Sequence, residues 1–388
     1  MAKIKNTEKA LFNISELVGQ LDKISGVDSV ILGDDPDSIK IENWISTGNY
    51  ALNAQISGSI FKGIPEGKTC MIAGDPGSGK SFLCLNITHD AIKQGYNVIW
   101  VDTEAAVDDE TFRRFGIDLS KIIYVSINTV NSLSTYLKNF IDRLKEAKDK
   151  KLNIGKYLVI IDSLGNLSTD KEVKDVTSGS DKADMTRAQQ LKKLFRVCTT
   201  DFGKLKIPVV LTNHTYDAVG AFFPTKIIGG GGGPFFNSST VLILSTAQLK
   251  DGEAKTGIIV TSKIKKSRFT KGGIPIKFHI SFYRGMNRYV GLEKYLDYES
   301  IGLGWGKLDK DGNYIEEEVT DKKVGKYVAV KHLDKHISFK KIFTSEIFTK
   351  EILEKLDEKI KPIFELPDIN SDYDIEEMVE LEDNETDE

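Results

Sequence analysis

The chain has 388 residues, of which 40% are hydrophobic, and its 53 Lys and Arg against 57 Asp and Glu give a net charge of −4. Its length predicts about two to three domains with a sizeable core. No apolar run reaches the roughly 18–20 residues of a membrane span, and no signal-peptide pattern opens the sequence, so we expect a cytoplasmic protein that neither spans a membrane nor is secreted. The three cysteines stand singly among apolar residues and are expected to be reduced core thiols.

The charge is unevenly distributed along the chain. Residues 372–388 contain ten Asp or Glu and no Lys or Arg, so the remainder carries a net positive charge. This asymmetry is typical of a polyanion-binding protein whose acidic tail competes with the polyanion. A solvated, disordered tail without a regulatory role is the alternative.

Residues 1–45 contain a helical pattern of apolar residues followed by a break rich in Gly and Asp. This segment is too small to fold alone and is predicted to dock on another surface, such as a neighbouring subunit. From about residue 45 onward, predicted strands and helices alternate. The predicted strands are Thr69–Ala73, Asn97–Asp102, Ile122–Ile127, Tyr157–Asp162, Ile207–Thr212 and Thr240–Ser245. The predicted helices are Ser81–Gln94, Asp109–Phe115, Val130–Lys148 and Asp184 to about Phe202. Alternation of this kind predicts an α/β fold with a mostly parallel central sheet flanked by helices.

The pattern changes after Ser245. Two β-rich stretches, Gly257–Ile264 and Ile274–Tyr283, lie close together and predict hairpin-like additions to the sheet. The more polar residues that follow predict a small mixed domain with a helix near Glu346–Ile360. The predicted organisation is an N-terminal docking segment (1–45), a core (46–285), a small C-terminal domain (286–371) and an acidic tail (372–388).

The stretch Gly74–Ser81 reads GDPGSGKS and fills every position of the phosphate-loop pattern G-x-x-x-x-G-K-[ST]. An apolar run precedes it and a helical pattern follows, which is the strand–loop–helix setting that phosphate binding requires. Lys80 is predicted to reach the β- and γ-phosphates, and the Ser81 hydroxyl to ligate Mg²⁺. The alternative, a glycine-rich turn with an incidental Lys-Ser, is disfavoured by the flanking elements. The residues predicted to bind the nucleotide are Gly74, Asp75, Pro76, Gly77, Ser78, Gly79, Lys80, Ser81, Phe82 and Asp162.

Three further strands end in polar side chains. Asp162 follows four apolar residues and is predicted to hold Mg²⁺ with Ser81. Glu104 ends another strand and is a candidate for the group that positions or deprotonates water. His214 closes a third strand, where it could sense the γ-phosphate. From position alone, an ordinary strand-ending Asp and a structural or surface His are the alternatives.

Two long polar loops are predicted on the nucleotide side of the sheet. One is 168–184, and the other is 215–233, which contains Lys226 and ends in five glycines, Gly229–Gly233. Five consecutive glycines are incompatible with a core strand or helix and suit a hinge or a close approach of backbone amides to phosphates. The layout predicts an ATP-switched polyanion binder. Two ordinary surface loops are the alternative.

These residues resemble RecA-type recombinases, above all the phage members of that family. The resemblance covers roughly residues 45–290 and is specific in several runs along that span. The runs are Ser46–Gly48, Ile161–Leu167, Asp184–Ala188, Leu194–Arg196, Asn213–Tyr216, Gly230–Pro234, Lys250–Gly252 and Lys266–Arg268. It implies a RecA-like P-loop ATPase core, with a small N-terminal oligomerisation segment and a small C-terminal domain. It also implies a DNA-dependent ATPase that forms helical filaments on single-stranded DNA and exchanges strands with homologous double-stranded DNA.

The resemblance also assigns roles to individual residues. It implies that Glu104 activates the attacking water, that His214 senses the γ-phosphate, and that Lys266 and Arg268 reach the ATP of the adjacent subunit. It places the DNA-binding residues in or beside the two loops, at Arg187, Lys226, Gly230 and Gly231. A family tyrosine that stacks on adenine would fall at Thr111, so either Phe112 replaces it or the base is held differently.

The implied cofactors are ATP and Mg²⁺. The implied partners are single- and double-stranded DNA, further copies of the chain, a recombination mediator or loader and a single-strand-binding protein, with no membrane partner; the implied setting is a phage protein in the bacterial cytoplasm. Two alternatives share the nucleotide site. One is a RecA-fold hexameric helicase or another DNA-dependent motor, and the other is a coating protein that uses ATP only to lock a conformation.

Overall fold

The structure, a computed structural model, describes residues 13–26, 29–32, 39–178, 186–217, 226–320 and 325–367. Its contacts divide the chain into two units, residues 1–42 and 43–388. In the first unit, helix α1 (Ile14–Ser25) begins where the Asn13 side chain accepts a hydrogen bond from the Ser15 amide, and it ends at Gly26 with φ of 63°. No residue of α1 is buried. Among all the described residues, no helix has the length and apolar character to cross a membrane.

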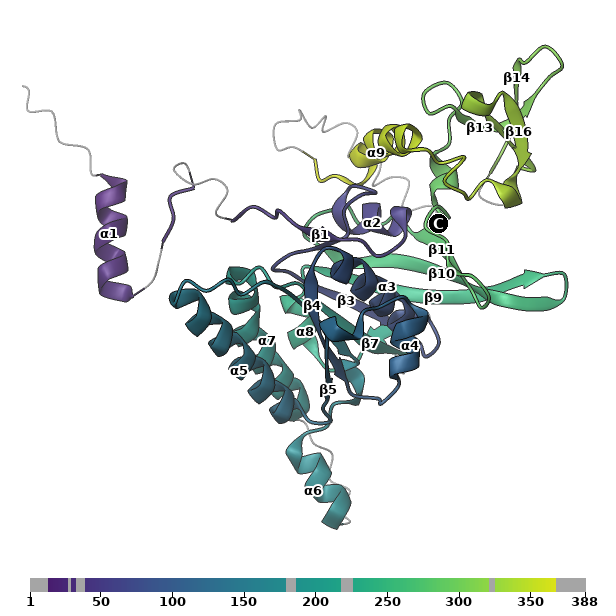
Figure 1. The fold of residues 1–388 in the computed structure, drawn as a ribbon. Coiled ribbons are helices and arrows are strands. Elements are labelled where there is room, and N and C mark those ends of the chain that lie inside the picture. Colours follow the sequence, from purple (N-terminus) through teal and green to yellow (C-terminus); the bar gives the residue numbers. More distant parts are fainter. Residues whose placement is uncertain are drawn as a thin grey trace, which may run out of the picture. The chain divides into compact units, whose positions relative to one another are not determined.

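A ten-stranded sheet forms the centre of the second unit (Figure 1). Its strands are β3 (Thr69–Gly74), β4 (Tyr96–Asp102), β5 (Ile122–Ser126), β6 (Lys156–Asp162), β7 (Val209–Asp217), β8 (Lys226–Ile228), β9 (Thr240–Asp251), β10 (Ala254–Ser267), β11 (Ile276–Ser281) and β12 (Gly285–Met286). The order across the sheet is β12-β11-β10-β9-β3-β7-β6-β4-β5, and β8 pairs with β7 outside this path. In this order, the six strands β9, β3, β7, β6, β4 and β5 are parallel to one another. Strands β10, β11 and β12 are added antiparallel beyond β9, and β10 and β11 are the additions that the sequence predicted.

Helices cover both faces of this sheet (Figure 1). Helix α3 (Lys80–Lys93) packs on one face, while α5 (Val130–Asp149) and α7 (Thr186–Lys204) lie side by side on the other. Strand β4 shows the alternation, because Val98 and Trp100 face the α3 core and Ile99 and Val101 face the α5–α7 core. The predicted α/β architecture is therefore confirmed.

Shorter elements connect these layers. They are β1 (Trp44–Ile45), α2 (Tyr50–Ser57), β2 (Ile64–Pro65), α4 (Asp109–Arg114), α6 (Asp170–Ser178) and α8 (Gly232–Asn237). Three elements occupy parts of the segments expected to be loops. Helix α6 lies in the 168–184 segment, β8 lies in the 215–233 segment, and α8 begins in the second segment and extends beyond it.

The expectation that the glycine run excludes a core strand or helix was wrong for its last two residues, since α8 begins at Gly232. A Cβ on Gly233 would lie 2.5 Å from the Lys192 Cα, and one on Gly231 would lie 2.8 Å from the Ala188 Cβ. The glycines therefore allow α8 to approach α7 closely. Pro234 is tolerated because it lies in the first turn of α8, where the amide has no partner within the helix.

The C-terminal part of the second unit has its own apolar core. A four-stranded sheet contains β13 (Leu303–Leu308), β14 (Tyr314–Glu316), β15 (Tyr327–Val330) and β16 (Lys335–Ser338), and α9 (Lys350–Phe364) follows it. Thr349 caps α9, which begins later than predicted. This core also includes Ala51 and Ala54 of α2 and Ile276 of β11, so the C-terminal elements pack on the nucleotide-binding part. The predicted domain boundaries remain a prediction, and the acidic tail lies outside the described residues.

We expect Leu356→Ala in α9 to lower the free energy of unfolding by about 2–5 kcal/mol, because Leu356 is completely buried in this third core. Urea denaturation followed by circular dichroism measures the change. The matched control is Glu358→Ala on the exposed side of α9, which should change it by less than about 0.5 kcal/mol. Equal effects of the two substitutions would contradict the packing of α9 described here.

Candidate active site

The phosphate loop connects β3 to α3. Gly77 and Gly79 have φ of 73° and 89°, a region that side chains disfavour. A Cβ on Gly74 would lie 2.5 Å from the Ser78 Oγ, so this position also requires glycine. Lys80 is 7% exposed, and its Nζ donates hydrogen bonds to the carbonyl oxygens of Gly74 and Asp75, at 2.9 and 3.0 Å. The loop thus holds a buried ammonium next to the free amides of a helix N-terminus, an arrangement suited to polyphosphate.

Strand register brings carboxylates to this loop. Asp102 of β4 is paired with Asp162 of β6, so the chain beyond both strands emerges at one edge of the sheet. Burial raises the pKa of Asp162, and hydrogen bonds from Ser81 and Thr212 oppose that rise. Burial also lowers the pKa of Lys80, while the nearby Asp162 and Glu104 carboxylates raise it. The loop lysine and the strand-end carboxylates therefore form one electrostatic unit.

The oxygens of Ser81 and Asp162 lie together, as the magnesium prediction requires. Hydroxyl and carboxylate oxygens are the hard ligands that Mg²⁺ prefers, and this ion usually binds through one or two protein carboxylates together with substrate phosphates. Among the described residues, no group of three or more His, Cys, Asp or Glu could hold a metal ion. The residues present therefore fit an ion that completes its coordination with phosphate oxygens and water.

Glu104, Ser163 and His214 meet beside the loop. The Ser163 Oγ donates to the Glu104 Oε1 at 2.5 Å, and the His214 Nε2 lies 3.2 Å from the same oxygen. Ser163 is in turn held by Thr103, whose Oγ1 donates to the Ser163 carbonyl at 2.7 Å. The other ring nitrogen of His214, Nδ1, is buried without a hydrogen-bond partner among the described residues. Sequence reasoning found Glu104 and His214 but missed Ser163 as the residue between them.

A cavity of about 540 Å³ opens over these groups. Its polar side consists of the phosphate loop together with Glu104, Asp162 and His214. Its apolar wall contains Phe82 and three residues from β10, β11 and the turn after them, Ile258, Ile280 and Phe282. Sequence reasoning missed these last three residues, because hydrophobic strand residues carry no signal of which cavity they face. A polar end and an apolar wall suit a ligand with phosphates and a flat base.

Comparison with known proteins agrees with this geometry. Residues 12–287 match the family model of the RecA N-terminal domain. The chain belongs to the RecA family. It is 31% identical to the recombination and repair protein of Enterobacteria phage T4, over 69% of this chain and 65% of that protein. It is also 25% identical to the RecA protein of Sulfurimonas denitrificans, over 77% and 87% of the two chains, and 27% identical to that of Wolinella succinogenes, over 84% and 86%.

The matched region spans just under two thirds of the phage T4 protein's length. RecA membership accounts for the phosphate loop, the strand-end carboxylates and the sheet that carries them. The roles of individual residues were assigned by resemblance and remain predictions.

The suggestion that Phe112 replaces an adenine-stacking tyrosine of RecA relatives was wrong. Phe112 is 3% exposed and packs edge-on against the Trp100 ring with centroids 5.2 Å apart, so it belongs to the core under α4. Thr111 is held at the start of α4, where its amide and hydroxyl both donate to Asp108. The alternative that the base is held differently remains, and Phe282 is an aromatic side chain in the apolar wall of the cavity.

Lys266 and Arg268 do not line the cavity. The Lys266 Nζ donates to the carbonyl oxygens of Phe235 and Phe236, at 3.3 and 2.7 Å, and burial lowers its pKa. The single chain thus does not bring these two cations to its own phosphate loop. Their predicted action on the ATP of an adjacent subunit is untested in a single chain.

The residues predicted to bind DNA lie at the borders of the two loops, whose central residues 179–185 and 218–225 are outside the described part of the chain. Arg187 donates to the carbonyl oxygens of Leu164 and Gly165. Gly230 and Gly231 lie against α7, at Leu191 and Ala188. These contacts give the three residues structural roles, and their predicted contacts with DNA are untested.

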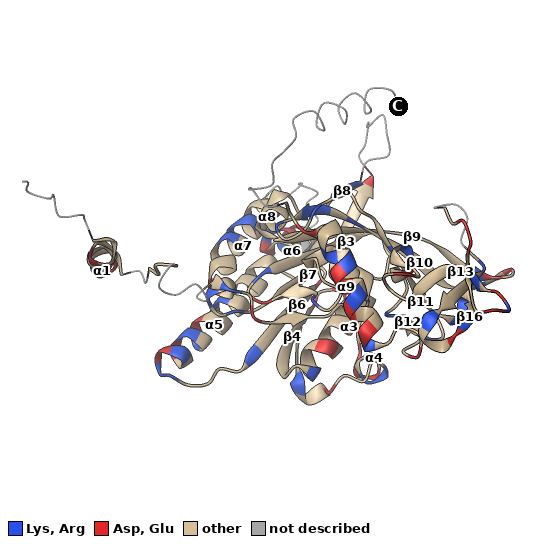
Figure 2. Cartoon of the chain, turned by 90° about the horizontal axis from the view of Figure 1, so that it is seen from above, with Lys and Arg blue, Asp and Glu red and all other residues tan. Residues whose placement is uncertain are grey.

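Helix α7 carries a basic face that sequence reasoning did not identify as a site (Figure 2). Lys192, Lys193 and Arg196 are exposed on it, and none of the three forms an ion pair with any residue the structure describes. A run of two lysines with an arginine three positions later was the available signal. Uncompensated cations beside Arg187 are suited to polyanion binding.

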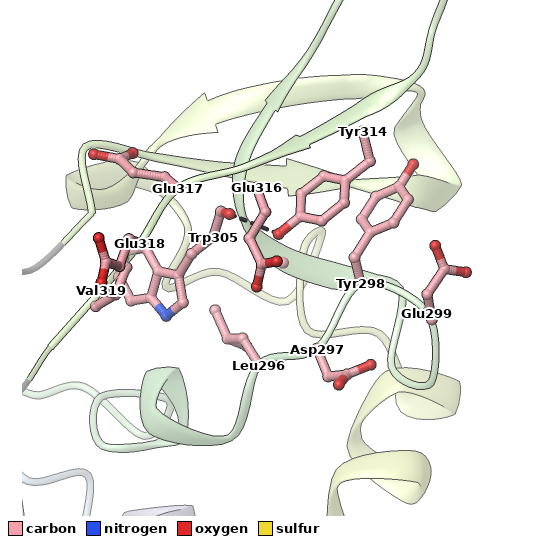
Figure 3. A pocket seen from close by; sticks show the side chains of 11 residues that line it. Leu296, Asp297, Tyr298, Glu299, Trp305, Tyr314, Glu316, Glu317, Glu318 and Val319 are labelled. Carbon is pink, nitrogen blue, oxygen red and sulfur yellow. Dashed lines mark hydrogen bonds between the residues drawn. The ribbon is translucent and has the colours of Figure 1, made fainter.

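A second cavity, of about 640 Å³, lies in the C-terminal part of the chain (Figure 3). Its lining includes the carboxylates Asp297, Glu299, Glu316, Glu317 and Glu318. Tyr298 and Tyr314 stack at its edge with ring centroids 4.1 Å apart. Burial and the nearby carboxylates raise the pKa of Tyr314 to about 12. This negative field disfavours a polyphosphate in the second cavity.

We expect Phe282→Ala to weaken binding of a fluorescent adenine nucleotide by about five- to tenfold. The substitution removes one base–aromatic contact, which contributes roughly 1 kcal/mol or more. Phe112→Leu, which preserves an apolar core side chain, should leave that affinity within about twofold, since Phe112 does not reach the cavity. Equilibrium titration measures both variants. The opposite ranking would show that the base lies on the α4 side.

Proposed function

We propose that this chain is an ATP-dependent DNA recombinase that forms helical filaments on single-stranded DNA and catalyses homologous pairing and strand exchange. The observation that carries the proposal is the cluster of Glu104, Ser163 and His214 at the edge of the phosphate cavity. His214 belongs to β7, the strand that runs on into the second predicted DNA-binding loop. Because His214 lies on this strand and contacts the Glu104 carboxylate, it connects the state of the bound nucleotide to DNA binding.

In this proposal, the phosphate loop and Lys80 bind the triphosphate of the substrate ATP, and Phe282 covers the base. Ser81 and Asp162 hold Mg²⁺, which supplies charge neutralisation at the phosphates. The Glu104 carboxylate accepts the proton of the attacking water, while Ser163 fixes that carboxylate through its hydrogen bond to Oε1. Products are ADP and inorganic phosphate.

The His214 ring lines the cavity beside the Glu104 carboxylate, and its Nε2 can exchange the contact with Glu104 for one with a phosphate oxygen. When that contact forms, the ring shifts relative to Glu104, and β7 transmits the shift toward residues 215–217. The exposed cations of α7 and Lys226 then supply phosphate contacts to DNA, which make binding salt-dependent.

The proposal extends to partners and setting. Further copies of the chain form the filament, with the 1–45 segment docking on the next protomer and Lys266 and Arg268 acting at its ATP. A recombination mediator and a single-strand-binding protein are the expected accessory partners, and the site of action is the cytoplasm of a phage-infected bacterium.

The deciding experiment mixes the purified chain with ATP, Mg²⁺, single-stranded DNA and a homologous duplex. A recombinase produces joint molecules, and electron microscopy shows open helical filaments on the DNA. Closed rings and unwinding without pairing would instead identify a RecA-fold motor. Absence of both pairing and filaments would refute the proposal.

We expect Glu104→Gln to lower DNA-stimulated ATP hydrolysis by about 10²- to 10⁴-fold, because the amide cannot accept the proton from water. Binding of a non-hydrolysable ATP analogue and filament formation should persist, since the phosphate loop is unchanged. The matched control is Glu253→Gln in the exposed turn between β9 and β10, which should hydrolyse ATP at the wild-type rate. A phosphate-release assay and a filter-binding assay separate the two effects.

A further inference from the structure

Lys226 connects the phosphate loop to the β7–β8 hairpin. Its Nζ lies 3.2 and 3.1 Å from the two carboxylate oxygens of Asp75 and 2.9 Å from the Asp217 Oδ1. Asp75 is the second residue of the phosphate loop, and Asp217 is the last residue of β7. A single ammonium group thus contacts both the nucleotide site and the base of a predicted DNA-binding loop.

Strand register explains why these groups meet. Asp217 is paired with Lys226 in the antiparallel hairpin, and Thr215 lies two residues earlier, on the same face of β7 as Asp217. In the parallel pairing of β3 with β7, Gly74 is opposite His214, which places Asp75 next to Thr215. The Thr215 Oγ1 donates to the Asp75 Oδ1 at 2.6 Å. The strand register and the hydrogen bond from Thr215 therefore fix the position of the Asp75 carboxylate.

A negatively charged side chain in a phosphate-binding loop repels a phosphate ligand unless a cation neutralises it. The hydrogen bond from Thr215 and the contact with Lys226 hold the pKa of Asp75 below its usual value, so the carboxylate stays charged at neutral pH. Lys80 contacts the backbone carbonyl of Asp75 and not its carboxylate. Among the described residues, Lys226 is the one cation in an ion pair with that carboxylate.

The pair is also easily broken. The Lys226 and Asp75 side chains are 38% and 49% exposed, and exposed ion pairs are weak and screened by salt. A DNA phosphate that approaches the β7–β8 hairpin offers Lys226 an anion of similar strength. When Lys226 binds that phosphate, the Asp75 carboxylate keeps its hydrogen bond from Thr215 but loses its positively charged partner.

We propose that Lys226 is shared between the Asp75 carboxylate and a phosphate of single-stranded DNA, so that DNA binding unmasks a negative charge in the phosphate loop and promotes release of the product ADP, which lacks the γ-phosphate that His214 would contact. This inference rests on the proposed function for its polyanion. Because one ammonium cannot neutralise both anions, each contact weakens the other by the same factor. Asp75 and Lys226 act as positioning residues that link DNA occupancy to nucleotide turnover.

The first test measures binding of a fluorescent oligo(dT) to the nucleotide-free protein. Asp75→Asn, which keeps an oxygen to accept from Thr215, should tighten binding by about two- to fivefold, the strength of an exposed ion pair. In a Lys226→Met background the same substitution should have no effect. A tightening that persists without Lys226 would overturn the proposal.

The second test needs no DNA and measures ADP affinity. Lys226→Met leaves Asp75 unneutralised and should weaken ADP binding by about two- to fivefold, and adding Asp75→Asn should restore it. Asp217→Asn is the matched control, because it removes the contact of Lys226 with a carboxylate outside the phosphate loop. This substitution should change the affinity for DNA without weakening the affinity for ADP. Unchanged ADP affinity in Lys226→Met refutes the sharing of Lys226 whatever the DNA result. A wild-type chain that binds ATP but no DNA refutes the proposed function instead.

Discussion

Parallel pairing of β3, β7, β6 and β4 is the constraint on which the rest of this site depends. Parallel strands all end at the same edge of their sheet, so residues far apart in sequence meet where each strand stops. The register of Gly74 with His214, and of Asp102 with Asp162, brings together the phosphate loop, the predicted magnesium ligands and the carboxylate predicted to activate water. Without that register, each residue would be an ordinary strand end.

The same pairing makes β7 the connection between two functions. Its C-terminal half leaves the parallel sheet and forms a hairpin with β8, which carries contacts back to the phosphate loop through Thr215 and Lys226. His214 lies on this strand beside Glu104. The residues proposed for nucleotide chemistry and for polyanion binding therefore lie on one strand.

The extent to which the sequence predicted the site differs from residue to residue. The phosphate loop was recognisable because glycine, lysine and serine at fixed spacing have few other uses, and Asp162 because an apolar run preceded it. Phe112 was misjudged because an aromatic residue beside a binding motif looks the same whether it faces ligand or core; only its packing on Trp100 separates the two. The glycine run was misread because its function is the close approach of α8 to α7, a contact between segments about forty residues apart.

By itself, the sequence determined the α/β alternation, the phosphate loop and the strand-ending carboxylates, because each depends on local spacing and on the period of buried residues. Only the tertiary structure decided which side chains complete the cavity, since Ile258, Ile280 and Phe282 reach it through antiparallel strands added at the far side of β9. It also decided that Ser163 holds Glu104 and that Lys226 pairs with Asp75. Such contacts arise from strand order and register, and these follow from the packing of the whole sheet and not from neighbouring residues.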